Sequence, residues 1–162
     1  MNETIMGATG LDWAYLGAAV AAIGGGIGSS IGITSIANTA AGIVSEDPEK
    51  FGKLLPLAAM PGTQGIYGLV TMILVFVFTG VFAGTVDLTP SEGLRVFYSC
   101  LPVAFVCAVS GIYQGLTAVG AAGMVARRDE DAGKALIFPA LVETYAVFSL
   151  VVTILMLLYV TG

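Results

Sequence analysis

The sequence contains no histidine and few charged residues, with six Lys and Arg and eleven Asp and Glu among 162 residues. It therefore offers neither an imidazole for acid–base chemistry nor a basic stripe for nucleic acid. Its two cysteines, Cys100 and Cys107, lie seven residues apart in one apolar stretch, which favours packing over a metal cluster or a disulfide. Nucleotide-binding motifs are also missing. We expect no catalytic chemistry in this chain.

Apolar residues, by contrast, make up 57% of the chain, well above the share in an ordinary soluble domain. They form four long stretches, roughly 15–44, 54–86, 96–126 and 135–160. Each exceeds the ~20 residues that an α-helix needs to cross ~30 Å of hydrocarbon, and nothing alternates with the two-residue period of a membrane strand. The sequence predicts an all-α membrane protein whose four transmembrane helices form two hairpins.

Basic residues indicate how the hairpins cross the membrane. Five of the six flank the turns inside the predicted hairpins, and only Arg95 lies elsewhere: Lys50, Lys53, Arg127, Arg128 and Lys134. The positive-inside rule then places both turns in the cytoplasm and both termini on the other side of the cell membrane. Residues 1–13 contain no Lys or Arg, so the basic start of a cleavable signal peptide is missing and we expect the first helix to be retained.

The second half of the chain repeats the first. When residues 29–74 are aligned with residues 110–155, 17 of 46 positions are identical, where small apolar residues alone would give only about five. We predict a first hairpin in residues 1–84 and a second in residues 85–162. Each half begins and ends on the same side of the membrane, so the repeats are parallel and related by an axis along the membrane normal. Parallel repeats favour assembly into a ring.

Glycines recur every four residues in the first predicted helix, at Gly24, Gly28 and Gly32. Such a bare face lets two membrane helices approach closely. A phosphate-binding loop is the competing interpretation, but such loops follow a strand and usually carry a lysine. No strand precedes these glycines, so we assign them to helix packing.

One carboxylate, Glu143, interrupts the fourth apolar stretch nine residues beyond Lys134. A helix rises ~1.5 Å per residue, so Glu143 lies about 14 Å deep, near the middle of the hydrocarbon. An unpaired charge there costs at least ~2.5 kcal/mol on insertion scales. Glu143 must therefore be protonated, ion-bound or hydrogen-bonded.

A polar face on the second predicted helix reaches the same depth. Its members follow the spacing i, i+3, i+4, i+7 and are Met60, Thr63, Gln64 and Tyr67. Gln114 of the third helix lies at a similar level. Pro61 also removes a helix N–H and frees a carbonyl in the preceding turn. Hydroxyl, amide, carbonyl and carboxylate oxygens together suit a hard cation, although the same groups could form an interhelical hydrogen-bond network around a protonated Glu143.

With these residues the sequence closely resembles the proteolipid (K or c) subunits of V-type and A-type rotary ATPases. The resemblance covers essentially the whole chain: duplicated hairpins, a glycine-rich first helix and the segment P-A-L-V-E ending at Glu143. Sodium-coupled members of that family carry P-G-T-Q in helix two and a glutamine in helix three, as residues 61–64 and Gln114 do here. The resemblance implies a non-catalytic rotor-ring subunit that turns in the lipid against a membrane stator, driven by ATP hydrolysis in partner subunits.

The resemblance also implies roles for individual residues. Glu143 would be the ion carrier, with a hydrogen bond from Tyr67, and the sodium ligands would be Glu143, Thr63, Gln64, Gln114 and the carbonyl of Met60. The cytoplasmic turns would dock a central-stalk subunit. Short relatives in the family have one carboxylate per hairpin, but here the repeat aligns Gly62 with Glu143 and Ile33 with Gln114. Each chain would thus hold one complete site, which favours a pump over a synthase.

Three alternatives remain open from the sequence. The ring could carry protons alone, because a proton needs only the carboxylate. The protein could be a free-standing, proton-coupled secondary transporter, although parallel repeats and a compact oxygen cluster argue against it. A structural four-helix scaffold would leave the polar cluster unexplained.

Overall fold

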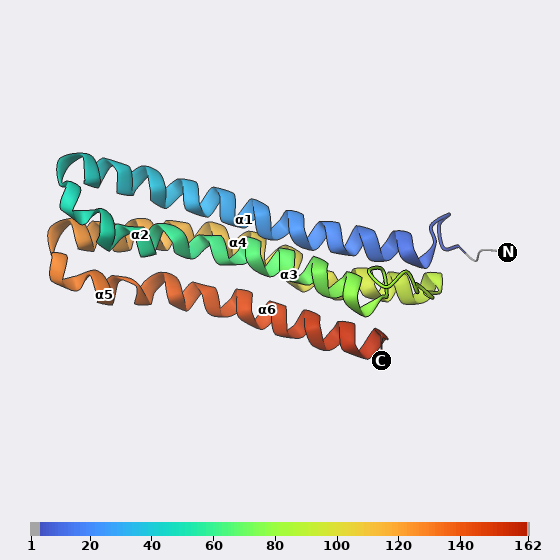
Figure 1. The fold of residues 1–162 in the computed structure, drawn as a ribbon. Helices are drawn as coiled ribbons and strands as arrows, with labels where there is room; N and C mark the ends of the chain where they lie inside the picture. Colours follow the sequence, from blue (N-terminus) through green and yellow to red (C-terminus); the bar gives the residue numbers. More distant parts are fainter. Residues whose placement is uncertain (1–3, 162) are drawn as a thin grey trace.

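The computed structural model describes residues 4–161, which form an all-helical bundle (Figure 1). Helix α1 spans Gly10–Glu46, α2 spans Phe51–Ala59, α3 spans Thr63–Phe78 and α4 spans Pro90–Arg127. Short helix α5 covers Ala132–Ala135, and α6 spans Ile137–Thr161. Three 3₁₀ turns join them, at Pro48–Lys50, Met60–Gly62 and Asp129–Asp131. Within the described residues, four helical segments are long and apolar enough to cross a membrane, as predicted.

The two longest helices begin with the same device. Thr9 caps α1 and Thr89 caps α4, each through a capping box with an acidic residue three positions later, Asp12 or Glu92. The side-chain oxygens satisfy backbone N–H groups that the first helical turn leaves unpaired. The start of each hairpin is therefore encoded locally.

The second membrane segment is shorter than its apolar stretch predicts. The helix ends at Phe78, although the apolar stretch continues to about residue 86. Gly80 and Gly84 have positive φ angles of 75° and 67°, and the chain turns there. Hydrophobicity gives the extent of apolar sequence, whereas the left-handed glycines decide where the helix stops.

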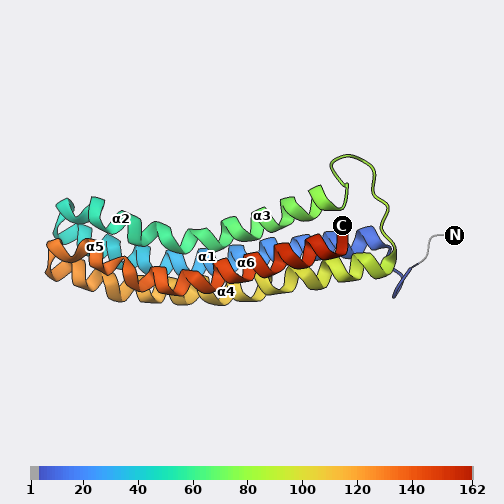
Figure 2. The same ribbon diagram turned by 90° about the horizontal axis from the view of Figure 1, so that it is seen from below.

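The long helices pack around the pair α1 and α4, which have the most extensive contact. Helix α3 packs on α1, and helix α6 packs on α4. The turns between the limbs of each hairpin lie at one end of the bundle, and the α3–α4 loop and the C-terminal end of α6 lie at the other (Figure 2).

The segments predicted as the two hairpins, 1–84 and 85–162, include residues 1–3 and 162, which lie outside the described part. The absence of a signal-peptide start was likewise predicted partly from residues 1–3.

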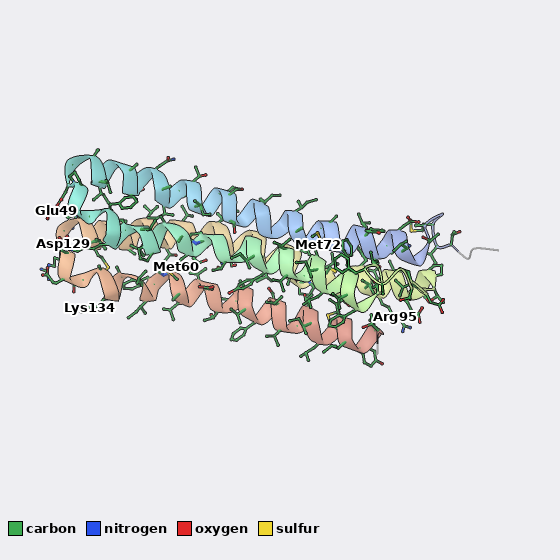
Figure 3. All side chains as sticks on the ribbon, viewed as in Figure 1. Glu49, Met60, Met72, Arg95, Asp129 and Lys134 are labelled. Carbon is green, nitrogen blue, oxygen red and sulfur yellow. The ribbon has the colours of Figure 1, made fainter. Side chains whose placement is uncertain are left out.

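Apart from Glu143, charged side chains collect at the two ends of the bundle. Figure 3 shows Glu49, Asp129 and Lys134 at the turn end and Arg95 at the opposite end. Lys53 pairs with Asp129 of the other hairpin at 2.7 Å. Lys50 donates a hydrogen bond to the Ala126 carbonyl, also at 2.7 Å, and so covers the exposed carbonyl end of α4. The two turns are tied together at one end, as a pair of turns on one side of a membrane would be.

Candidate ion-binding site

The candidate site lies where α3, α4 and α6 meet. The Tyr67 hydroxyl donates a hydrogen bond of 2.9 Å to Oε1 of Glu143, which is partly buried. Gln114, fully buried on α4, donates its Nε2 to Oε2 of the same carboxylate at 3.4 Å. Three helices therefore contribute to the surroundings of one carboxyl group. These are residues that the sequence placed at a common depth.

The second half of the site comes from the 3₁₀ turn before α3. The turn contains Pro61, which has no N–H to continue an α-helix. The hydroxyl of Thr63 donates to the Met60 carbonyl at 3.0 Å, and it lies 3.4 Å from Oε1 of Gln64. A carbonyl, a hydroxyl and an amide oxygen thus form one hydrogen-bonded series.

A glutamine pair connects the two halves. Gln64 is fully buried, and its Nε2 donates to Oε1 of Gln114, which itself donates to Glu143. The network therefore runs from Met60 through Thr63, Gln64 and Gln114 to the carboxylate. All six residues that the sequence assigned to the site, including Tyr67, belong to this one network.

Two contributors were missed by sequence reasoning. The Pro139 carbonyl accepts a 3.1 Å hydrogen bond from Nε2 of Gln114 and so orients that amide. Ser29 on α1 accepts a 2.7 Å hydrogen bond from the backbone N–H of Gly65 and holds the start of α3. The proline four residues before Glu143 was a visible signal for the first, whereas nothing in the sequence distinguished Ser29 from the other hydroxyls of α1.

The glycine face of α1 lies beside the site. Cβ atoms at Gly24, Gly28 and Gly32 would collide with the backbone of α4, so glycine at these positions allows α1 and α4 to approach closely. The adjacent Gly25 allows α1 to contact the backbone of Gln64. Close packing against Gly25 thus fixes the position of the Gln64 backbone, from which the side chain extends into the site.

The electrostatic character of the site is that of a single acid among neutral oxygens. Within residues 4–161 no group of three His, Cys, Asp or Glu side chains gathers at one point, and no salt bridge reaches Glu143. A divalent ion there would leave an uncompensated positive charge in hydrocarbon, which is costly. A monovalent cation or a proton neutralises the carboxylate completely.

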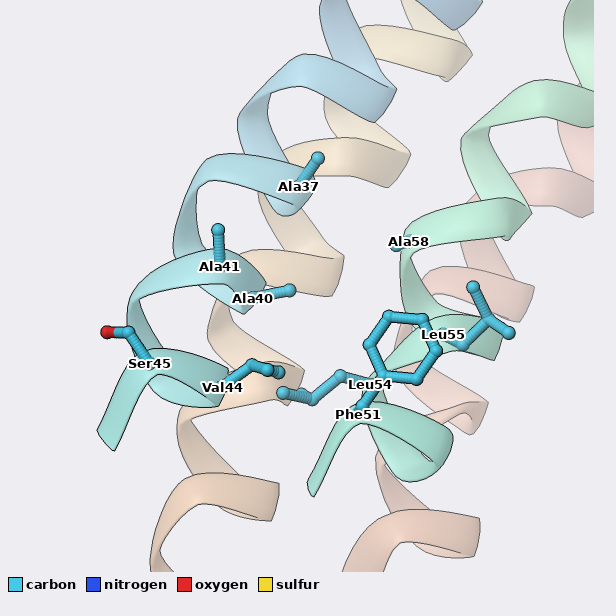
Figure 4. A pocket seen from close by; sticks show the side chains of 9 residues that line it. All are labelled: Ala37, Ala40, Ala41, Val44, Ser45, Phe51, Leu54, Leu55 and Ala58. Atoms are coloured by element: carbon cyan, nitrogen blue, oxygen red, sulfur yellow. The ribbon is translucent and has the colours of Figure 1, made fainter. Parts of the chain in front are cut away.

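The apolar groove between α1 and α2 is a separate feature, of about 470 Å³. Figure 4 shows Ala40 and Val44 on one side and Phe51 and Leu55 on the other. Its one hydroxyl, on Ser45, already donates to the Gly42 carbonyl. This groove offers nothing to hold an ion.

Comparisons with known proteins agree with the duplicated architecture. Residues 16–75 and 97–156 each match the family model of the ATP synthase C subunit, and the two matched segments stand in the register of the internal repeat. The chain is 40% identical to the V-type sodium ATPase subunit K of Enterococcus hirae over 149 residues, 92% of each chain. It is 38% identical to the A-type ATP synthase subunit K of Methanocaldococcus jannaschii over 148 residues, 91% of this chain and 64% of that one.

Proposed function

Because the chain belongs to the family of the ATP synthase C subunit, we propose that it is an ion-carrying subunit of the rotor ring of a V-type or A-type rotary ATPase. The resemblance to the proteolipid subunits of these enzymes is confirmed by the relatives. The chain is a multi-pass membrane protein and a non-catalytic, ion-translocating component, with ATP hydrolysis residing in partner subunits.

The observation that carries this proposal is the setting of Glu143. Its carboxylate is held between Tyr67 and Gln114 on the inner side of α6, while the neighbouring residues Leu141 and Tyr145 are exposed on the apolar surface of the bundle. A bare carboxylate cannot face hydrocarbon cheaply, whereas a neutralised one can. Loading of Glu143 would therefore control whether the ring can turn from the stator into lipid.

Sodium is the proposed ion. Its ligands would be the carboxylate of Glu143, the side-chain oxygens of Thr63, Gln64 and Gln114, and the Met60 carbonyl, all hard oxygen donors. Four neutral oxygens beside one carboxylate exceed what a proton needs, and a relative with 40% identity is named a sodium ATPase subunit. In the structure, Gln114 donates its Nε2 to Glu143 and its Oε1 accepts from Gln64, so loading would require the Gln114 amide to turn its oxygen toward the ion.

A proton-carrying ring is the second candidate. Glu143 lies beside the Tyr67 hydroxyl, and a hydroxyl, unlike the N–H of an amide, can turn to accept a hydrogen bond from a protonated carboxyl group. In that case the amides would be structural members of a hydrogen-bond network.

Release of the ion requires a partner. Among the described residues, no Lys or Arg forms a salt bridge with Glu143, so a stator subunit would supply the cation that displaces the bound ion. The joined turns, with Lys50, Lys53 and Lys134, would face the cytoplasm and dock a central-stalk subunit, leaving both termini on the opposite side.

The deciding experiment measures labelling of Glu143 by a carboxylate-modifying carbodiimide at fixed pH. Sodium should slow labelling in a saturable manner, while potassium and choline at equal ionic strength should not. Labelling that depends on pH but not on sodium would overturn the sodium assignment and support the proton ring. Labelling that responds to neither would remove Glu143 as the carrier.

A further inference from the structure

Helix α3 begins inside a membrane-spanning segment, Pro48–Phe78, without a capping side chain of its own. It starts at Thr63, and the residue before it is Gly62, which has no side chain that could accept a hydrogen bond from the first turn. The first N–H groups of a helix have no partner within the helix, and an unpaired N–H buried away from water is costly. The start of α3 therefore needs an acceptor from elsewhere in the bundle.

Ser29 of α1 supplies that acceptor. Gly65 is the third residue of α3, and its N–H donates a hydrogen bond of 2.7 Å to the Ser29 hydroxyl oxygen. The N–H at this position is one that the side chain of a capping residue ordinarily receives. Ser29 thus caps α3 from another helix, and within residues 4–161 this is the one hydrogen bond between α1 and α3.

Ser29 differs in this contact from the other hydroxyl residues of α1. Each of those donates to a carbonyl of its own helix three or four residues earlier: Ser30, Thr34, Ser35, Thr39 and Ser45. Such bonds involve only the backbone of α1. Ser29, which is only 7% exposed, is the hydroxyl of α1 that bonds to α3.

Close packing brings the Ser29 hydroxyl within reach of α3. A Cβ atom added to Gly65 would lie 3.1 Å from the Ser29 hydroxyl oxygen. One added to Gly25, a turn before Ser29 on α1, would collide with the Gln64 carbonyl. The start of α3 is therefore held on α1 by one polar contact and by the direct approach of two backbones.

The capped turn carries the part of the site that only sodium requires. The Met60 carbonyl, the Thr63 hydroxyl and the Gln64 amide are three of the five proposed sodium ligands, and all of them immediately precede Gly65 (Figure 3 labels Met60). A proton needs only the carboxylate of Glu143, on α6. A shift of the first turn of α3 would therefore disturb the sodium ligands and leave the carboxyl group in place.

The hydrogen bond from Tyr67 to Glu143 has separate support. Gly68, next to Tyr67, packs on the backbone of α1, where a Cβ atom would collide with the Ala21 carbonyl. This second close approach of α1 and α3 lies about one turn beyond Gly65. Tyr67 should thus keep its place when the first turn of α3 loses its cap.

We propose that Ser29 is a positioning residue that sets the sodium affinity of the site and leaves the proton affinity of Glu143 unchanged. Ser29 supplies no ligand to the ion. It acts through the Gly65 N–H, which holds the turn that carries the Met60, Thr63 and Gln64 ligands. The inference rests on the sodium binding of the proposed function and adds to it a residue of α1, a helix that contributes no ligand.

The internal repeat provides a matched comparison. Ser110 of α4 corresponds to Ser29, and Ala146 of α6 corresponds to Gly65. Helix α6 begins at Ile137, so Ala146 lies in its interior, where the helix pairs its own N–H groups. Ser110 is also buried, and its hydroxyl has no partner within residues 4–161. One serine of the pair caps a helix start, whereas the other has no helix start to cap.

The variant Ser29→Ala tests the proposal in the complete membrane protein by two measurements of carbodiimide labelling at Glu143. The sodium concentration that halves labelling at fixed pH should rise by about 2- to 13-fold, the range for one hydrogen bond. The pH that halves labelling in the absence of sodium should not change, because Tyr67 and Gln114 still hold the carboxyl group. Ser110→Ala removes the same group from α4 and should leave both values unchanged.

A double variant tests the route of the effect. If Ser29 acts through the turn that carries Gln64, the substitutions Ser29→Ala and Gln64→Ala affect the same interactions and should not be additive. The loss of sodium affinity caused by Ser29→Ala should therefore be smaller when Gln64 is already alanine. Equal losses in the two backgrounds would contradict an action through this turn.

The possible failures can be told apart. If sodium protects the unsubstituted protein and Ser29→Ala equally well, Ser29 has no positioning role and the proposed function stands. A shift of both the sodium and the pH values, or an equal loss in Ser110→Ala, would indicate a general structural contribution and overturn the inference. If sodium does not protect the unsubstituted protein, the sodium assignment is wrong and this inference is wrong with it.

Discussion

The first hairpin, α1 to α3, and the second, α4 to α6, bring corresponding positions together but with different side chains. In the second, Gln114 on α4 contacts Glu143 on α6 at 3.4 Å. In the first, Ile33 occupies the place of Gln114, and its Cδ1 lies 3.6 Å from where a Cβ of Gly62 would be. One helical framework thus holds a polar pair in one hairpin and an apolar pair in the other.

The same difference extends to the supporting residues. Ser29 accepts a hydrogen bond from the Gly65 N–H, whereas its counterpart Ser110 has no partner within residues 4–161. Tyr67 corresponds to Phe148, which cannot donate to a carboxylate. Each hairpin therefore supplies only part of a site, and the complete site combines α3 of the first with α4 and α6 of the second.

Replacing Glu143 by glutamine should erase the functional difference between the hairpins. Glu143→Gln keeps the shape of the side chain without the charge, so the chain should still assemble while ion transport by the complete ATPase falls to background. Ion uptake into vesicles and loss of carbodiimide labelling are the readouts. Glu92→Gln, in the capping box of α4, is the control, and transport surviving in Glu143→Gln would contradict the carrier role.

Transferring a side chain from the second hairpin to the first should break the packing of α1 on α4. Gly28→Val installs the residue that α4 carries at the corresponding position, but its Cβ would collide with the Cys107 carbonyl. We expect a loss of stability of about 3 kcal/mol, the upper range for overpacked sites, because the obstacle is backbone. Thermal unfolding in detergent measures it, with Gly42→Val in open space as the control; equal stability of the two variants would refute the close approach.

Removing an amide from the first hairpin's share of the site should weaken sodium binding. Gln64→Ala deletes the amide that links Thr63 to Gln114 and, in the proposed site, one oxygen ligand of the sodium ion. A lost polar contact to a charged group such as this ion is worth about 1.5–3 kcal/mol, or ~10- to 100-fold in sodium affinity. The sodium concentration that halves carbodiimide labelling reports the change. Tyr145→Ala, at the corresponding position of α6, should leave affinity unchanged, and an unchanged Gln64→Ala would remove Gln64 from the site.

The smallest expected effect comes from replacing Tyr67 of the first hairpin by the phenylalanine that the second hairpin carries at the corresponding position. Tyr67→Phe introduces the residue that α6 already has as Phe148 and removes the 2.9 Å hydrogen bond to Glu143. A single hydrogen bond of about 0.5–1.5 kcal/mol corresponds to a ~2- to 13-fold weaker sodium affinity. The carbodiimide-labelling assay should show a smaller loss of sodium affinity for Tyr67→Phe than for Gln64→Ala. A sodium affinity equal to that of the unsubstituted protein would show that the hydrogen bond from Tyr67 does not contribute to loading.

The candidate site was largely predictable because helices convert spacing into geometry. The i, i+3, i+4, i+7 pattern of Met60, Thr63, Gln64 and Tyr67 defines one face, and distance from the charged turns gives its depth. The hydrogen bond from Gln114 to the Pro139 carbonyl was not predictable. It depends on how far α6 is rotated and shifted against α4, which no spacing within either helix specifies.

By itself the sequence determined that this is an all-α membrane protein of two repeated hairpins with one intramembrane carboxylate. Hydrophobic length, basic residues and self-similarity are properties of the chain that need no partner in space. Only the tertiary structure decided which helices touch, that Gln64 reaches Gln114, and that Ser29 of α1 accepts from Gly65 of α3. The physical reason is that contacts between helices depend on their rotation and axial offset, which the whole bundle sets through packing.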